Sequence, residues 1–123
     1  MDYTYQEILK QSTTWEKTLH YLKEQENYFS QFLAETYDNV IFTGCGSSYN
    51  LSLVASHFWQ TGKQIPARGV PASETFLFPG GVFLPRNRYL LFGISRSGET
   101  TETVKALQHF QDKFKGKTVG VSC

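Results

Sequence analysis

The apolar run Tyr89-Leu90-Leu91-Phe92-Gly93-Ile94 leads directly into Ser95-Arg96-Ser97-Gly98-Glu99-Thr100-Thr101, and this junction decides the fold. The run is typical of a strand that is buried on both faces. The segment from Thr103 to Phe114 then has the apolar spacing of a helix. A loop of hydroxyls and glycine between a strand and a helix presents backbone N–H groups and side-chain hydroxyls to an anion. The junction therefore predicts an α/β unit with an anion site.

A second junction of the same kind lies upstream. The expected strand Val40-Ile41-Phe42-Thr43 is followed by Gly44-Cys45-Gly46-Ser47-Ser48-Tyr49. The glycines allow the backbone to approach closely, and Ser47 or Ser48 is expected to cap a helix over residues 49–60. Gly62 suits the C-terminal cap of that helix. Its apolar residues are Leu51, Val54, Ala55, Phe58 and Trp59. Two such junctions in one short chain indicate one anionic ligand held between them.

The other elements complete an alternating pattern. Residues 65–70 are expected to form a strand, which Pro66 confines to a strand start or a sheet edge. Residues 71–76 are expected to open a short helix with Ser73 as its cap, and residues 118–122 to form a fourth strand. Such alternation predicts a parallel sheet with helices on both faces. Ligands bind such sheets outside the carboxyl ends of the strands, where both hydroxyl loops lie.

The N-terminal region is expected to be helical over residues 4–22 and 27–36. Apolar residues recur there at steps of three and four: Ile8, Leu9, Trp15, Leu19 and Leu22. We therefore expect a helical segment over residues 1–38 that covers the sheet, and a domain over residues 39–123. Because the chain ends just after a strand, we expect an α/β domain that is incomplete at its C-terminus and part of a larger protein. An exposed sheet edge favours self-association into a homodimer or a higher homo-oligomer.

Composition excludes several classes of function. The 123 residues suit one small domain, and 12 basic against 11 acidic residues leave no electrostatic case for nucleic acid as a partner. The N-terminus has no signal-peptide pattern, and no apolar stretch reaches the roughly 18–20 residues of a membrane span. Two cysteines without CxxC spacing indicate a cytoplasmic protein.

No metal or cofactor is expected. The three histidines, His20, His57 and His109, lie far apart without acidic or cysteine neighbours at ligand spacing. The Gly44-x-Gly46 pattern lacks the third glycine of the dinucleotide fingerprint, and no P-loop pattern is present.

The hydroxyl loops match the needs of a phosphate monoester, whose terminal oxygens take several short hydrogen bonds. Ser48, Ser95, Ser97 and Thr100 supply the hydroxyls, and Arg96 adds a cation. The alternative interpretation is that Ser47 and Thr100 only cap helices. Under this interpretation Gly98 only permits the backbone conformation of a turn.

Two acids near the predicted site, Glu74 and Glu99, are candidate catalytic residues. Either is suited to act as a general base that moves a proton between adjacent carbons of a sugar. The alternative for both is a favourable charge in a first helical turn. Cys45 is a candidate nucleophile near a helix N-terminus; its alternative role is that of a small packing residue.

These motifs together resemble a known family. Gly44-Cys45-Gly46-Ser47-Ser48-Tyr49, Ala72-Ser73-Glu74 and the run from Ser95 to Thr103 resemble the first sugar isomerase (SIS) domain of the glucosamine-6-phosphate synthase type. The aldose-ketose isomerases and deaminases of tagatose and galactosamine phosphates are equally similar. Glu7-Ile8-Leu9-Lys10-Gln11 resembles the helix that precedes the sheet in both groups.

The resemblance implies a flavodoxin-like three-layer α/β/α sandwich that binds a hexose phosphate or an amino-hexose phosphate. It assigns the phosphate to Ser48, Ser95, Ser97 and Thr100, and the sugar end to Cys45, Gly46 and Ser47. Arg96 stands where the synthase has Gln, and an Arg at this position fits the isomerase branch better.

The resemblance therefore predicts the phosphosugar-binding domain of an isomerase, a deaminase or an aminotransferase. The chain begins Met1-Asp2, where the synthase carries an N-terminal cysteine nucleophile. The synthase's acid/base groups come from regions outside these residues, so binding is implied more strongly than catalysis. The alternatives are a non-catalytic sugar-phosphate sensor and a truncated fragment without activity.

Overall fold

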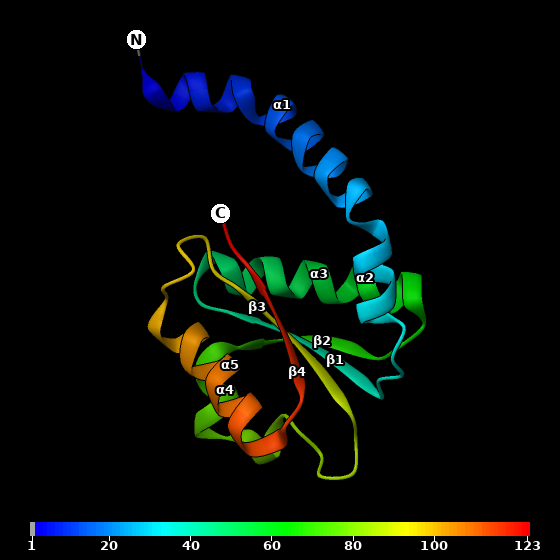
Figure 1. Ribbon diagram of the computed structural model, residues 1–123. Coiled ribbons are helices and arrows are strands. Elements are labelled where there is room, and N and C mark those ends of the chain that lie inside the picture. Colours follow the sequence, from blue (N-terminus) through cyan, green and yellow to red (C-terminus); the bar gives the residue numbers. More distant parts are fainter. Residues whose placement is uncertain (1) are drawn as a thin grey trace. The chain divides into compact units, whose positions relative to one another are not determined.

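The computed structural model describes residues 2–123, which form two compact units divided between Thr36 and Tyr37 (Figure 1). The first unit contains helix α1 (Tyr3–Glu24) and helix α2 (Glu26–Leu33). The Asp2 carboxylate caps α1 by accepting a hydrogen bond of 3.1 Å from the Thr4 N–H. Neither helix contains a buried residue. That these helices cover the sheet stays a prediction.

The second unit is built on a four-stranded sheet. Its strands are β1 (Asn39–Gly44), β2 (Ala67–Pro71), β3 (Tyr89–Ile94) and β4 (Lys117–Val121). All pairings are parallel, in the order β2-β1-β3-β4. Figure 1 shows α3 (Ser47–Lys63) on one side of this sheet, and α4 (Ala72–Leu77) with α5 (Thr101–Phe114) on the other. The predicted three-layer α/β/α fold is confirmed.

The main core lies between the sheet and the layer that contains α5. It joins side chains from three strands to two aromatic rings from outside the sheet: Ile41, Val70, Tyr89 and Leu91 with Phe83 and Phe110. Phe83 follows the short 3-10 helix η1 (Pro79–Gly81), in the connection between α4 and β3. Burial on this scale anchors β1 and β3 side by side at the centre of the sheet.

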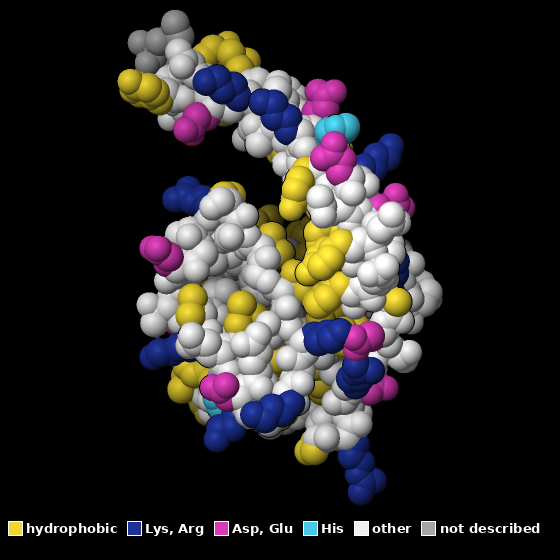
Figure 2. All heavy atoms as spheres, viewed as in Figure 1, with side chains coloured by type: hydrophobic (Ala, Val, Ile, Leu, Met, Phe, Trp, Pro, Cys, Tyr) yellow, Lys and Arg dark blue, Asp and Glu magenta, His cyan; other side chains and the backbone are white. Residues whose placement is uncertain are grey.

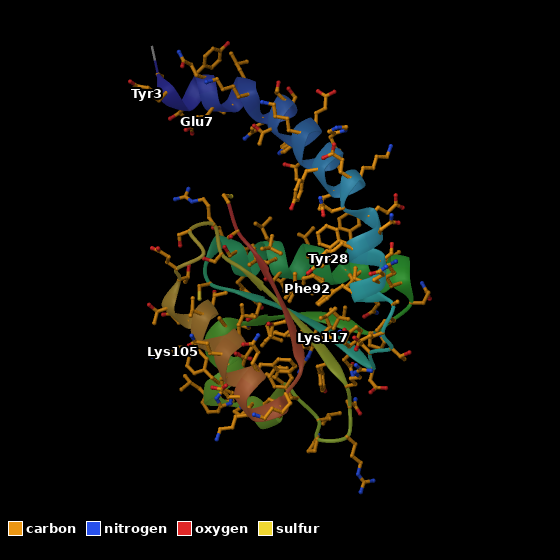
Figure 3. All side chains as sticks on the ribbon, in the orientation of Figure 1. Tyr3, Glu7, Tyr28, Phe92, Lys105 and Lys117 are labelled. Carbon is orange, nitrogen blue, oxygen red and sulfur yellow. The ribbon has the colours of Figure 1, made fainter. Side chains whose placement is uncertain are left out.

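The other face of the sheet packs against α3 through aromatic rings. Phe42 and Phe92 stack with their centroids 4.6 Å apart, and Trp59 of α3 meets both rings. Figure 3 labels Phe92 on this side of the sheet. These contacts hold the C-terminal half of α3 against the middle of β1 and β3.

Helix α3 buries small residues and exposes large ones. Ser52 and Ser56 face the sheet, whereas Leu51, Val54 and Phe58 are exposed. The cause is close contact with β2, because a Cβ added at Gly69 would lie only 2.8 Å from the Leu53 backbone nitrogen. At that separation only small side chains fit between helix and strand.

Three predicted helix caps are wrong. Neither Ser47 nor Ser48 caps α3, because Gly46 is the N-cap residue and no side chain bonds to the first turn. The C-cap of α3 is Gln64 in the left-handed region (φ 56°), rather than Gly62, and the Gln64 amide donates to the Thr61 carbonyl oxygen at 2.8 Å. Ser73 lies inside α4, whose N-cap is Pro71.

Candidate functional site

The order of the strands places two loops next to each other. The chain leaves β1 through α3 towards β2 on one side, and β3 lies on the other side of β1. The register pairs Thr43 of β1 with Gly93 of β3, so both strands end at the same level. This switch in strand order is where open α/β sheets bind their ligands. We call residues 44–48 the β1 loop and residues 95–100 the β3 loop.

The β3 loop gathers two hydroxyls around that of a buried serine. Ser95 is only 5% exposed. Its Oγ lies 2.8 Å from Oγ1 of Thr100 and 3.5 Å from Oγ of Ser97, and it accepts a hydrogen bond of 3.1 Å from the Gly98 N–H. Gly98 has a φ of +72°, a conformation that favours glycine. The loop is therefore wound tightly around the Ser95 hydroxyl.

The beginning of α5 has no side-chain cap. Thr100 occupies the N-cap position, but its hydroxyl contacts Ser95 and makes no capping hydrogen bond. The interpretation that Thr100 serves only to cap the helix is therefore wrong. An uncapped N-terminus presents backbone N–H groups at the positive end of the helix dipole, which suits a negatively charged oxygen.

The β1 loop also leads into a helix without a side-chain cap. Gly46, the N-cap residue of α3, has φ 56° and ψ −125°. Gly44 permits close contact, because a Cβ there would lie 2.8 Å from the Ser48 carbonyl carbon. The Ser48 N–H donates to the Cys45 carbonyl oxygen at 3.1 Å. Within residues 2–123 the half-buried Ser48 hydroxyl makes no hydrogen bond, and Ser47 is exposed.

Cys45 brings the two loops together. Its Sγ lies 3.9 Å from Oε2 of Glu102 and 4.0 Å from Oγ1 of Thr103, both in the first turn of α5. The sequence prediction omits Glu102 and Thr103. Both residues directly follow the predicted loop, and this position in the expected first helical turn is the sequence signal that could have identified them. Glu102 is thus a further acid near the predicted site, besides the two candidates Glu74 and Glu99.

The other predicted residues lie on the surface at the same edge. Arg96 and Glu99 are exposed on the β3 loop, where the Glu99 N–H donates to Ser97 Oγ at 3.1 Å. Glu74 is exposed in the first turn of α4, directly after β2. Across the described residues, no hydrogen bond or ion pair joins its carboxylate to either loop. The loops thus form one cluster, and Glu74 lies outside its contacts.

The β3 loop is also tied to the end of β4. The Ser95 N–H donates to the Val121 carbonyl oxygen at 3.0 Å, and the Cys123 N–H donates to that of Arg96 at 3.1 Å. A Cβ at Gly98 would lie 3.4 Å from Cβ of Ser122. The backbone of the loop is therefore positioned by both neighbouring strands, which suits a preformed binding site.

Residues 33–123, which include both loops and every predicted site residue, match the family model of the SIS domain. The chain belongs to the SIS domain family. The glutamine–fructose-6-phosphate aminotransferase of Chlamydia muridarum is 29% identical over 123 residues, which cover 97% of this chain and 20% of that protein. This SIS chain thus spans about a fifth of the length of the curated relatives that it matches first.

Solved structures of SIS relatives confirm the resemblance. The tagatose-6-phosphate ketose/aldose isomerase of Escherichia coli superimposes with a TM-score of 0.88 at 20% identity, covering 99% of this chain and 34% of that one. The glucosamine-6-phosphate deaminase of Thermotoga maritima gives a TM-score of 0.60 at 31% identity, covering 86% of this chain and 34% of that one. The first likeness supports the fold, and the second adds sequence similarity.

The described residues show neither a metal-binding cluster nor a membrane-spanning helix. Across residues 2–123, no three His, Cys, Asp or Glu side chains gather into a group that could hold a metal ion. In the same part of the chain, no helix combines the length and the apolar character needed to cross a membrane.

Proposed function

We propose that this SIS domain binds a hexose 6-phosphate or an amino-hexose 6-phosphate, with the phosphate between the β1 and β3 loops. The observation that carries the proposal is the contact of Ser95 and Thr100, 2.8 Å apart, directly before the uncapped N-terminus of α5. Hydroxyls and N–H groups of this kind match the terminal oxygens of a phosphate monoester. The relatives are named for fructose 6-phosphate, tagatose 6-phosphate and glucosamine 6-phosphate, which supports the same ligand class.

Each loop residue has a proposed role. Ser95, Ser97, Thr100 and Ser48 donate hydrogen bonds to the phosphate oxygens, and Arg96 adds positive charge from the loop surface. Cys45, Gly46 and Ser47 line the sugar end of the site. The Cys45 contacts with Glu102 and Thr103 support this division, because they place the β1 loop beside the first turn of α5.

We further propose that the protein containing this domain is a sugar-phosphate isomerase, deaminase or aminotransferase. A proton would move between the carbonyl carbon and its neighbour through an enediol-type intermediate, with Glu74 or Glu99 as the candidate general base. Anchoring the phosphate at one end orients the reacting carbons at the other. A sugar-phosphate sensor without catalysis is the alternative that uses the same binding site.

Calorimetric titration tests the binding proposal. Fructose 6-phosphate, tagatose 6-phosphate and glucosamine 6-phosphate are titrated into the chain, with fructose as the ligand that lacks a phosphate. At least one phosphosugar should bind and fructose should not. The double variant Ser97→Ala with Thr100→Ala should abolish binding. The matched pair Ser12→Ala with Thr13→Ala, two exposed residues of α1, should leave it unchanged.

The same titrations separate the alternatives. Retained affinity in the double variant would refute the phosphate-loop assignment. Binding without turnover by the protein that contains this domain supports the sensor, whereas turnover that depends on Glu74 or Glu99 supports the enzyme. Absence of binding by all three phosphosugars contradicts both.

We also propose that the chain forms a homodimer or a higher homo-oligomer in the cytoplasm. The exposed Leu51, Val54 and Phe58 of α3 support self-association. In the described sheet β4 pairs only with β3, which leaves an edge open to another chain. The free thiols of Cys45 and Cys123 support a reducing compartment. Sedimentation that shows a monomer at high concentration would contradict the oligomer.

A further inference from the structure

A cavity of about 420 Å³ lies at the opposite end of the sheet from the two loops. Its walls come from Tyr37 before β1, from residues 84–89 that lead into β3, and from Phe110 and residues 114–117 at the end of α5 and the start of β4. All these residues belong to the second unit. The cavity shares no residue with the β1 or β3 loop, and its volume lies in the range of small-molecule sites.

The charge around this cavity is positive. Four of its lining residues are cations, Arg86, Arg88, Lys115 and Lys117, and none is acidic. Figure 2 shows Lys and Arg side chains along the lower part of the second unit, near the loop that precedes β3. The nearby Asp38 carboxylate accepts a hydrogen bond from the Arg88 backbone N–H at 2.6 Å. The cavity therefore favours an anion.

The helix dipole accounts for only part of this charge. Lys115 and Lys117 follow the C-terminus of α5, where cations are favoured without any ligand. Arg86 and Arg88 come from a different segment, the loop before β3, and the Arg88 guanidinium carbon lies 5.4 Å from the centre of the Tyr37 ring. Positive charge from two separate segments thus converges on one cavity.

A buried hydroxyl beside the cavity lacks a partner. Tyr37 is only 5% exposed, and its hydroxyl forms no hydrogen bond within the described part of the chain. A buried hydroxyl without a partner is unfavourable, because it has lost its hydrogen bonds to water. Tyr89, which lines the same cavity, has its hydroxyl satisfied by the Leu84 N–H at 2.8 Å. An acceptor oxygen of a ligand would satisfy Tyr37 in the same way.

The cavity also offers an aromatic surface. Phe110 and Phe114 stack at 5.7 Å with an interplanar angle of 26°, and Phe114 remains 38% exposed. Gly116 has no room for a side chain, because a Cβ there would overlap the Phe110 ring. Phe83 packs against both rings, so they are held in place, and the exposed part of Phe114 is available to a flat group.

We propose that this cavity is a second ligand site, for a nucleoside monophosphate. The base stacks on Phe114, and the phosphate binds Arg86 and Lys115. Tyr37 donates its hydroxyl to an oxygen of the same ligand. The site is independent of the hexose-phosphate proposal, because it uses other residues at the other end of the sheet.

Titration with adenosine 5′-monophosphate tests the proposal in the presence and absence of saturating fructose 6-phosphate. The nucleotide should bind in both conditions, and adenosine, which lacks the phosphate, at least tenfold more weakly. The double variant Arg86→Gln with Lys115→Gln should weaken binding at least tenfold. The matched variant Lys63→Gln with Lys105→Gln, which removes two exposed cations elsewhere, should not change it.

Two further measurements distinguish binding in this cavity from binding between the β1 and β3 loops. In the Tyr37→Phe variant the nucleotide should bind several-fold more weakly, while affinity for fructose 6-phosphate stays the same. In amide NMR spectra the nucleotide should shift Asn87 and Gly116 and leave Gly98 unchanged. Absence of nucleotide binding, equal binding of adenosine, an unchanged affinity in the Arg86/Lys115 variant or shifts at Gly98 alone would each overturn the proposal.

Discussion

Oγ of Ser95 and Oγ1 of Thr100 lie 2.8 Å apart, on opposite sides of a loop that turns between them. Ser95 directly follows β3 and is buried, and Thr100 is the N-cap residue of α5. One hydroxyl contact thus fixes where the helix starts relative to the sheet. It also leaves the first N–H groups of the helix without a side-chain acceptor.

Replacing Thr100 by Val removes this contact while keeping the shape of the side chain. We expect affinity for fructose 6-phosphate to fall about tenfold, or about 1.4 kcal/mol, because a phosphate ligand is lost and the helix start loosens. Stability should fall by about 1 kcal/mol. Calorimetry and thermal unfolding measure both. The control is Thr18→Val, whose hydroxyl bonds only to the Thr14 carbonyl oxygen of α1; an unchanged affinity for Thr100→Val would contradict the assignment.

Replacing Ser97 by Asp separates folding of the loop from binding. Ser97 Oγ accepts the Glu99 N–H, and an Asp oxygen makes the same bond. The added carboxylate repels the phosphate, so we expect affinity to drop more than tenfold with little change in melting temperature. Ser12→Asp adds the same charge on α1 as a control. Full affinity in Ser97→Asp would place the phosphate elsewhere.

Cys45 should report on ligand binding through its reactivity. It is half-buried beside α5, whereas Cys123 is exposed. If a hexose phosphate lies between the loops, it covers Cys45. Alkylation of Cys45 by iodoacetamide should then slow about tenfold, because the bound sugar blocks access of the reagent to the thiol. Peptide mass spectrometry follows both thiols. Cys123 serves as the internal control; equal slowing of the two would point to a general effect.

Two glycine substitutions should have opposite effects on stability. Gly44→Ala forces a Cβ to within 2.9 Å of three Ser48 atoms, two of them in the backbone, so we expect a loss of about 1–3 kcal/mol. Gly62→Ala meets no atom within 4 Å inside α3, and should gain up to about 1 kcal/mol. Urea unfolding measures both. A Gly44→Ala variant as stable as the parent would mean that the β1 loop is not tightly packed on α3.

The sheet could be predicted from sequence because its strands are short apolar runs ended by polar loops. Tyr89–Ile94 has the same bounds in prediction and structure, and the helical spacing from Thr103 to Phe114 lies within α5. The caps could not be predicted in the same way. Ser, Thr and Gly are good caps on average, but Thr100 bonds to Ser95, and α3 continues past Gly62 to Lys63.

Contacts between residues far apart in the sequence could not be predicted from local sequence patterns. The burial of Ser52 and Ser56 in place of Leu51 and Phe58 depends on how closely α3 approaches Gly69, which belongs to the next strand along the chain. The contact of Cys45 with Glu102 depends on β1 and β3 being neighbours. Strand order is a property of the whole sheet, and hydrophobic periodicity carries little of it.

The parallel pairing of β1 with β3 has one more consequence. Neighbouring strands lie about 4.8 Å apart because of their backbone hydrogen bonds, so the width between the two loops is set by the main chain. Substitutions on the outer surface of α3 or α5 therefore leave this width unchanged. If a hexose phosphate binds between the loops as proposed, a change in preferred sugar should arise by exchanging a side chain at the sugar end, such as Ser47, while the contacts to the phosphate stay as they are.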